Sequence, residues 1–379
     1  MGKKDEIVVV AAYRTPFGKA TRGSFKATHA DYLLSKLIQK GMIKCGVRPE
    51  YIEEIVLGNV LTPLGGIVEA RIASLNAGIP QQTPISVINR LCASGLESIK
   101  IIADKIKNKE IMCGLAGGFE TMSHNSFTQK YSVSDQSDFV QDAKNCLIPM
   151  GETSEIVAEK LSISREDADV YAFHSHKKAF DAQTNNRFKY EIVPITNSEG
   201  EVIYKDDGIR EPNLQKMQSL NPCFKKSGVT TPANASQLSD GCAVVFLANR
   251  QFALEKNLPI IAKYIDCVSI GCAPELMGLG PVYAIKKLLR KHSLGIEDIE
   301  YFEINEAFAS QVIGCIEELG ISYDKANING GSIAMGHPLG STGARLAGTL
   351  LWNLSPQKYG VVSLCTATGM GTAALFLKE

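Results

Sequence analysis

Short apolar runs alternate with amphipathic stretches along the first part of the chain. The run IVVVAA at residues 7–12 predicts a buried strand, and two further strands are predicted at 52–60 and 83–89. Helices are predicted over 32–45 and 94–108, because their apolar residues recur every three or four positions. Strands that alternate with helices indicate βαβ units and a layered α/β architecture.

The same order of elements returns roughly 250 positions later in the chain. The segments LLSKLIQKGMIKC and AIKKLLRKHSLGI both read as an amphipathic helix that is followed by a polar turn and a strand. The sequence that begins at Cys92 aligns with the sequence that begins at Gly340, so that Gly95 matches Gly343. These matches predict two halves of one fold, related by duplication.

The segment between the two halves is richer in polar residues. It contains one clear helix, SREDADVYAFHSHKKAFDAQ, with Ser164 as the expected N-cap and Asp167 completing a capping box. Long insertions of this kind often carry function, so we interpret the segment as a lid. The strand-like run DGCAVVFLANR is expected to return to the first half. The predicted domains are 1–119 with 240–257 as the N-terminal half, 120–239 as the inserted lid, and 258–379 as the C-terminal half.

Charge and cysteine content narrow the class of protein. The 40 Lys and Arg residues balance 40 Asp and Glu residues, which argues against a nucleic-acid-binding protein. No apolar run approaches the roughly 18 residues of a membrane span, so no membrane partner is expected. Ten cysteines in 379 residues are too dilute for a disulfide scaffold, and none has zinc-site spacing. We therefore expect reduced thiols and no metal.

Cys92, in the sequence NRLCASG, is predicted to lie between a strand and a helix. The free N–H groups and the dipole of a helix N-terminus lower a cysteine pKa from about 8.5 into the range of roughly 3.5–7.5. Such a thiol would be a nucleophile. The alternative interpretation is a small residue at a tight turn between a strand and a helix.

Three further segments contain candidate reactive residues. His337 lies in GGSIAMGHPLGSTGAR, which lacks the G-K-[ST] of a P-loop and the glycine spacing of a dinucleotide site. Cys365 ends a buried strand where a glycine-rich turn begins, and Asn305 lies where an apolar strand meets a helix. Each residue also has a purely structural interpretation: a loop histidine, a core cysteine and a helix N-cap asparagine.

Taken together, these segments resemble the thiolase family over nearly the whole chain. The motifs are C-A-S-G at Cys92, N-E-A-F-A at Asn305, G-H-P-L-G-x-T-G-A-R around His337 and C-x-x-x-G-M-G from Cys365. The segments CLIPMGETSEIVAEKLSISRE, FKKSGVTTPANASQLSDG and PELMGLGPVYAI are most similar to the peroxisomal branch of the family. The resemblance implies duplicated βαβ halves in five layers, α/β/α/β/α, with an inserted loop (lid) domain.

The resemblance also implies a reaction, the thiolytic cleavage of 3-ketoacyl-CoA by CoA. Cys92 would accept the acyl group, His337 would take the thiol proton, and Cys365 would protonate the acetyl-CoA enolate. His337 and a water held by Asn305 would form one oxyanion site. The backbone N–H groups of Cys92 and Ala367 would form a second.

Partners and location follow from the same resemblance. Acyl-CoA and CoA are the expected ligands, with CoA as a co-substrate and no permanently bound cofactor. A homodimer is expected, or else a tetramer. The peroxisome or the cytoplasm is the expected compartment, although neither terminus shows an import signal. The residues expected to contact substrate or CoA are Ser236, Met150, Arg210, Phe224, Met277 and Phe308.

This chain departs from the family pattern at two places. Ala367 stands where the family usually has glycine, so a left-handed backbone there would be strained. Pro232 and Ala233 alter the usual T-A-G-N-A-S segment. Two alternatives therefore stay open: a biosynthetic acetoacetyl-CoA thiolase with a smaller acyl pocket, and a non-catalytic acyl-CoA- or lipid-binding protein of the same fold.

Overall fold

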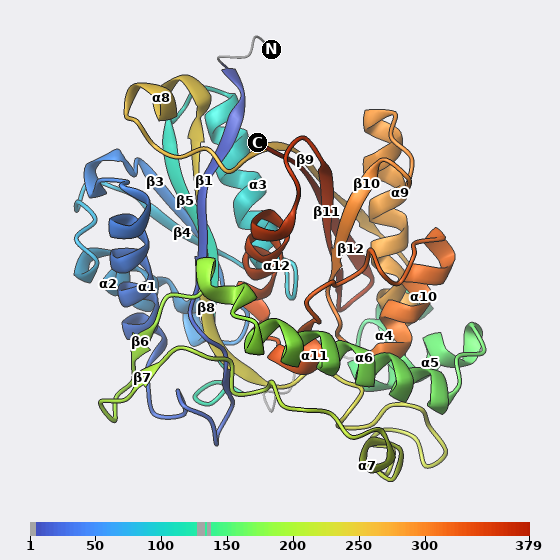
Figure 1. The fold of residues 1–379 in the computed structure, drawn as a ribbon. Coiled ribbons are helices and arrows are strands. Elements are labelled where there is room, and N and C mark those ends of the chain that lie inside the picture. The colour runs from blue at the N-terminus through green and yellow to red at the C-terminus, as the bar shows by residue number, and fades with distance from the viewer. Residues whose placement is uncertain (1–4, 127–132, 135–137) are drawn as a thin grey trace.

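The computed structural model describes residues 5–126, 133–134 and 138–379. Ten strands form one sheet that consists of two halves (Figure 1). The halves meet where Val8 and Val9 pair with residues of β9. In spatial order, the first half contains β4 (Ile85–Ile88), β3 (Glu54–Gly58), β5 (Cys113–Thr121), β8 (Ser239–Asn249) and β1 (Ile7–Arg14). The second half contains β10 (Ile299–Ile304), β11 (Tyr359–Thr366), β12 (Met370–Lys378) and β9 (Ala262–Gly271).

Strand directions in the two halves confirm the predicted duplication. In the first half, β3 is parallel to β5, whereas β5 is antiparallel to β8 and β8 is antiparallel to β1. In the second half, β10 is parallel to β11, β11 is antiparallel to β12, and β12 is antiparallel to β9. The parallel pairing of β4 with β3 in the first half has a shorter counterpart in the second half. There, Phe302 of β10 forms a parallel bridge with Ala326. Each half is therefore one copy of the same unit.

Helices cover both faces of both half-sheets and produce five layers, α/β/α/β/α (Figure 1). The outer layer of the first half is formed by α1 (Ala30–Cys45) and α2 (Ile67–Asn76), and that of the second by α9 (Gly280–His292) and α10 (Ala309–Leu319). The central layer contains α3 (Ser94–Lys107) and α12 (Leu339–Asn353). The fold class inferred from the sequence is confirmed.

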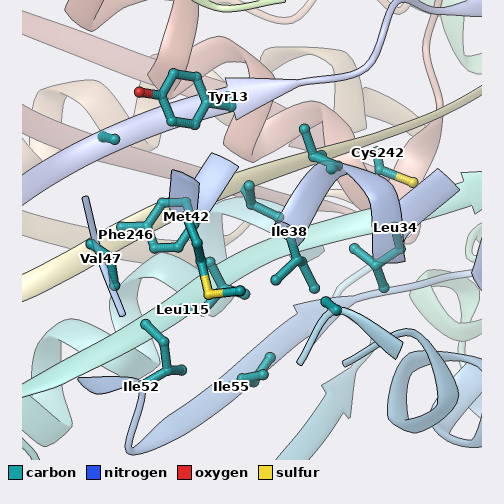
Figure 2. Close-up of a cluster of buried hydrophobic side chains, with 14 of the residues drawn as sticks. Tyr13, Leu34, Ile38, Met42, Val47, Ile52, Ile55, Leu115, Cys242 and Phe246 are labelled. Carbon is teal, nitrogen blue, oxygen red and sulfur yellow. The ribbon is translucent and has the colours of Figure 1, made fainter. Parts of the chain in front are cut away.

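The first-half core shows why the apolar spacing of α1 predicts a helix. Figure 2 shows Leu34, Ile38 and Met42 on one face of α1, directed at the sheet. They pack with Leu115 of β5 and Phe246 of β8, and all five side chains are buried. Burial of a side chain of this size contributes about 1.5–3 kcal/mol. The helix is therefore stabilised mainly by its packing against the sheet.

The two central helices cross with their backbones in close contact. A Cβ atom on Gly343 would lie 2.3 Å from the backbone nitrogen of Leu96, and one on Gly95 would lie 2.7 Å from the carbonyl oxygen of Gly340. The pair of glycines matched by the internal repeat thus forms this crossing. Because α3 and α12 cross near their N-termini, Cys92 and His337, which precede them, are brought to the same part of the molecule.

The described residues of the inserted segment, which we interpret as a lid, lie across one end of both halves (Figure 1). Its long helix α6 (Arg165–Thr184) begins with the predicted capping box, in which the Ser164 side chain accepts from Asp167 N–H. It packs against α10 and α11 (Ser332–Met335).

The remaining elements of the whole described chain are short. They are β2 (Gly18–Lys19), α4 (Gln141–Asn145), α5 (Met150–Lys160), β6 (Ile195–Thr196), β7 (Val202–Ile203), α7 (Leu214–Gln218), α8 (Arg250–Glu255) and 3-10 segments at Pro49–Tyr51, Pro63–Gly66, Arg187–Tyr190 and Pro274–Leu279. Within the described ranges, no helix has the length and hydropathy to cross a membrane.

Candidate active site

The four residues proposed for catalysis come from both halves of the fold, and all four are buried. Cys92 precedes α3, whose N-cap is Ala93. His337 precedes Pro338, the N-cap of α12. Asn305 follows β10, and Cys365 is the second-last residue of β11. Asn305 is not a helix N-cap, because α10 begins four residues later with Phe308 as its N-cap.

Hydrogen bonds define the tautomer of His337. The hydroxyl of Thr342 donates to the carbonyl oxygen of Pro338 at 3.0 Å, so it accepts from Nδ1 of His337 at 2.7 Å. The amide Nδ2 of Asn305 lies 3.3 Å from Nε2 of His337 and can only donate. Nδ1 therefore has the proton, and Nε2 presents its lone pair. Burial, with a further contribution from the Arg345 cation, lowers the pKa of His337 to about 3, so the imidazole is neutral near pH 7.

The two cysteines are brought close to each other and to the turn after β11. The backbone N–H groups of Cys92 and Ala367 donate hydrogen bonds to the Cys92 sulfur. Burial raises the pKa of Cys365 well above its usual range, and the neighbouring Cys92 thiol raises it further. The two N–H groups expected to form an oxyanion site therefore converge on the sulfur of Cys92.

The expectation of a low pKa for Cys92 is wrong. Burial outweighs the two backbone hydrogen bonds and, with a smaller effect of the Glu120 carboxylate, raises the pKa of Cys92 to about 12. A helix N-terminus favours a thiolate, but removal of water disfavours it more strongly here. The Cys92 thiol and the His337 imidazole are therefore both neutral, and the thiol must lose its proton before or during any attack.

This protonation state predicts how Cys92 reacts in the free enzyme. Because its pKa lies well above 9, the thiolate fraction should rise about tenfold for each pH unit between 7 and 9. The rate of alkylation of Cys92 by iodoacetamide, measured by peptide mass spectrometry, should follow the same slope. The exposed Cys223 provides an internal comparison. A Cys92 rate that is already level above pH 7 would contradict the assignment.

Backbone strain at the turn after β11 lies one residue beyond the expected position. Ala367 is not among the residues with positive φ, whereas Thr368 has φ of 67° and Gly369 has φ of 84°. The expectation that Ala367 is strained is therefore wrong. Thr368 is β-branched, and a positive φ is unusual for such a residue. The Ala367 N–H keeps its direction toward Cys92, and the conformational cost falls on Thr368.

Replacement of Thr368 with glycine should remove this cost. A left-handed conformation costs a residue with a Cβ atom roughly 1–2 kcal/mol, and part of that gain is lost because glycine also gains freedom in the unfolded chain. We expect Thr368→Gly to raise the free energy of unfolding by about 1 kcal/mol in denaturant titrations. Thr366→Gly, in the strand of the same hairpin, should lower it. A destabilised Thr368→Gly would contradict the assigned strain.

Most of the expected substrate contacts gather near Cys365. Met277 is buried against Cys365, and Met150 and Phe308 pack against the same cluster. The ring of Phe224 meets that of Phe308 edge-on, with centroids 6.4 Å apart and planes at 87°. These side chains come from the lid, from the segment before α9 and from the turn before α10. They provide an apolar wall beside the second cysteine.

Ser236 and Arg210 lie in irregular segments of the lid, outside its helices and strands. The backbone N–H of Ser236 donates to the carbonyl oxygen of Ala307 at 2.9 Å, which joins the lid to the N-E-A-F turn. Arg210 is exposed, and its guanidinium donates to Gly208, a residue that closely approaches Ala334. Arg210 therefore lies near the segment that precedes His337, and it places a positive charge there.

A buried carboxylate that the sequence interpretation missed anchors the lid to the site. Glu306 accepts hydrogen bonds from Tyr171 and Ser175 of α6 at 2.9 and 2.7 Å, and also from Asn327 and from the backbone of Ile333. Glu306 is adjacent to Asn305 in the chain. Its partners are 21 to 135 positions away, so no local pattern identifies them.

A second missed carboxylate joins the two halves beside Cys92. Glu120, at the end of β5, accepts from the backbone N–H groups of Val60, Leu61 and Gly340 at 3.1 Å each. It therefore connects the loop after β3 to the first turn of α12. Burial raises the pKa of Glu120 to about 7, and these hydrogen bonds act in the opposite direction.

The site consists of thiol, imidazole, amide and backbone groups. Within the described parts of the chain, no group of three or more His, Cys, Asp or Glu residues could hold a metal ion. All ten cysteines are free thiols. The chemistry available from this arrangement is nucleophilic attack by sulfur, proton transfer through Nε2 and a second thiol, and stabilisation of an oxyanion by N–H groups.

Comparisons with known proteins agree with this geometry. Residues 7–251 match the N-terminal domain of thiolase, and residues 258–378 match its C-terminal domain. The chain is 46% identical to the peroxisomal 3-ketoacyl-CoA thiolase of Encephalitozoon cuniculi, over 98% of this chain and 95% of that protein. The dimeric peroxisomal thiolase of Saccharomyces cerevisiae superimposes with a TM-score of 0.96 at 44% identity, covering 99% of this chain and 98% of that one.

A further solved structure contains a ligand. Human mitochondrial 3-ketoacyl-CoA thiolase in complex with CoA superimposes with a TM-score of 0.89 at 35% identity, and the match covers 99% of this chain and 98% of that chain. Both domain matches together span nearly all of the sequence. The chain therefore belongs to the thiolase family.

Proposed function

We propose that this protein is a 3-ketoacyl-CoA thiolase, which uses CoA to cleave a 3-ketoacyl-CoA into acetyl-CoA and an acyl-CoA shortened by two carbons. The observation that carries the proposal is the placement of two buried thiols next to each other, one of them receiving the N–H groups of Cys92 and Ala367. The relatives named as 3-ketoacyl-CoA thiolases support it at 43–46% identity over nearly the whole chain.

In the first half of the reaction, Nε2 of His337 takes the proton of Cys92 as the sulfur attacks C3 of the substrate. The resulting alkoxide accepts hydrogen bonds from the backbone N–H groups of Cys92 and Ala367. The C2–C3 bond then breaks, and its electron pair passes to C2 to form the acetyl-CoA enolate. Protonated His337 and the Asn305 amide stabilise the enolate oxygen, and Cys365 donates a proton to C2.

In the second half, the Cys365 thiolate takes the proton of the incoming CoA thiol. The CoA sulfur attacks the acyl group on Cys92, and the C–S bond to Cys92 breaks. Cys92 leaves as a thiolate and recovers its proton from His337. Each group thus ends in its starting protonation state, which is a requirement for turnover.

The apolar wall of Met150, Met277, Phe224 and Phe308 is proposed to contact the substrate and CoA, with Arg210 near the CoA phosphates. The complex of the human mitochondrial relative with CoA supports CoA as the ligand. Comparison of kcat/KM for acetoacetyl-CoA and for a long-chain 3-ketoacyl-CoA tests the proposal. A higher value for the long chain is expected, whereas activity confined to acetoacetyl-CoA would indicate the biosynthetic alternative.

We propose that the protein forms a homodimer through the open edge of β4 and the adjacent helix α2. The dimeric yeast relative supports this assembly. The strand β4 is at the end of the sheet, and apolar side chains are exposed beside it. They are Leu64, Ile67, Val68, Ile72 and Leu75, and each of these residues is 36–89% exposed.

Charges placed on this surface should separate the subunits. Leu64→Asp combined with Val68→Asp puts two carboxylates against an apolar partner surface, so light scattering should report a mass near that of one chain. Ile43→Asp is the matched control, because Ile43 is an exposed apolar side chain on a different helix, α1. It should leave the mass at that of two chains. A dimer that survives both substitutions would place the interface elsewhere.

The peroxisome is the proposed compartment, because relatives that are 44–46% identical to this chain are named peroxisomal thiolases. Immunofluorescence of the protein in its own cells, beside a peroxisomal marker, tests this location. Co-localisation is expected. A diffuse signal would instead indicate the cytoplasm.

A further inference from the structure

Arg345 is a buried cation close to Asn305 and His337. It lies in the central helix α12, and its Nη2 donates to the hydroxyl of Ser332 at 2.9 Å. Its Nη1 is 3.6 Å from the Glu303 carboxylate of β10. Within the described structure, Nε and Nη1 have no hydrogen-bond partner. The guanidinium therefore makes its one hydrogen bond to Ser332.

The bond to Ser332 begins a directed chain of hydrogen bonds that ends on the imidazole. A guanidinium can only donate, so the Ser332 hydroxyl accepts from Arg345 and directs its own proton to Oδ1 of Asn305 at 2.7 Å. An Asn305 amide with Oδ1 held in this way must turn Nδ2 toward Nε2 of His337, at 3.3 Å. Each direction follows from the one before it.

We propose that Arg345 is a positioning residue that, through Ser332, holds the Asn305 amide with its NH2 group facing the lone pair of His337 Nε2. The importance of this orientation for turnover rests on the function proposed above. An inverted amide would present Oδ1 to Nε2, which would favour the tautomer protonated at Nε2. That tautomer cannot take the proton of Cys92.

Arg345 could otherwise serve as a structural connection between α12 and β10 through Glu303. The geometry favours the positioning role, because charge-assisted N–H···O bonds are typically about 2.7–2.9 Å and the Nη1–Glu303 separation is 3.6 Å. Burial raises the pKa of Glu303 to about 8, although the Arg345 cation acts against this. Buried ion pairs also add little net stability compared with apolar residues of similar volume.

The first test removes the Ser332 hydroxyl alone. Ser332→Ala should lower kcat by roughly 10- to 100-fold, because small misplacements of catalytic groups have effects of that order. The KM for CoA should change by less than about twofold, because Ser332 is not among the residues proposed to contact CoA. Thr349→Val is the matched control: its hydroxyl, on α12, is buried and has no partner in the described structure. It should retain the wild-type kcat.

The second test separates positioning from the ion pair. The double variant Arg345→Met with Glu303→Met replaces both charges with apolar side chains of similar length, so the protein should fold, yet kcat should fall as in Ser332→Ala. If the double variant does not fold, Ser332→Ala still decides the question. Wild-type kcat in Ser332→Ala, or in the folded double variant, would overturn the proposal.

A spectroscopic measurement distinguishes failure of this inference from failure of the proposed function. In protein labelled with 15N-histidine, Nε2 of His337 should resonate as an unprotonated ring nitrogen in the wild type and shift toward the protonated type in Ser332→Ala. If the wild type does not cleave any 3-ketoacyl-CoA, the proposed function fails, but the shift still tests the hydrogen-bond chain. An unchanged shift in Ser332→Ala would overturn that chain.

Discussion

Replacement of Cys92 with alanine is expected to reduce thiolysis by at least about 10⁴-fold, because the acyl group then has no sulfur to which it can be transferred. The remaining groups of the site, His337, Asn305 and Cys365, can bind and polarise the substrate but cannot form the covalent intermediate. Acetyl-CoA release from a 3-ketoacyl-CoA and CoA measures the effect. The alanine side chain fits the space of the thiol, so the thermal midpoint should change by only a few degrees.

Cys45→Ala is the matched control for this experiment. Cys45 is also buried and ends a helix, but it lies in the first-half core, where its sulfur contacts the Met42 carbonyl. Its replacement should leave kcat per folded molecule unchanged. Thiolysis retained by Cys92→Ala, or lost equally in Cys45→Ala, would show that Cys92 is not the nucleophile.

Replacement of Gly343 with alanine is expected to have the largest effect on stability. The added Cβ would lie 2.3 Å from the backbone nitrogen of Leu96, and backbone atoms cannot move aside as a flexible side chain can. The two central helices would have to separate, at a cost of roughly 3 kcal/mol or more. Since Cys92 and His337 precede these helices, kcat should fall as well. Denaturant titration at a fixed protein concentration measures the stability change.

Gly348→Ala on the same helix is the control. A Cβ there would meet its nearest neighbour, Cβ of Ala12, at 3.4 Å, an ordinary contact. Because alanine favours helix more than glycine by about 1 kcal/mol, Gly348→Ala should be neutral or slightly stabilising. Equal stabilities for the two variants would show that the crossing of α3 and α12 is less close than described.

The fold could be predicted from the sequence because its signals are local or repeated. The apolar spacing of α1 and α3, the buried run of β1 and the capping box at Ser164 each depend on neighbouring residues. The duplication is a comparison of one segment with another. Single-residue conformation was harder to predict, as the positive φ at Thr368 rather than Ala367 shows.

The electrostatics of the site could not be predicted, because they depend on burial and on distant partners. The sequence places Cys92 at a helix N-terminus, yet it does not show how completely the thiol is removed from water, and this determines the direction of its pKa shift. The hydroxyl of Ser332 meets Asn305 from 27 positions away. Arg345 is present in the quoted motif, but only the folded chain shows that it contacts Ser332.

The covalent intermediate is the most direct test of the proposed function. The enzyme is mixed with a 3-ketoacyl-CoA in the absence of CoA, quenched in acid within the first turnover, and digested for peptide mass spectrometry. The account predicts an acyl group two carbons shorter than the substrate chain, attached to the peptide that contains Cys92 and released when CoA is added. Cleavage that proceeds with no acyl group on Cys92, or with the acyl group on Cys365, would contradict it.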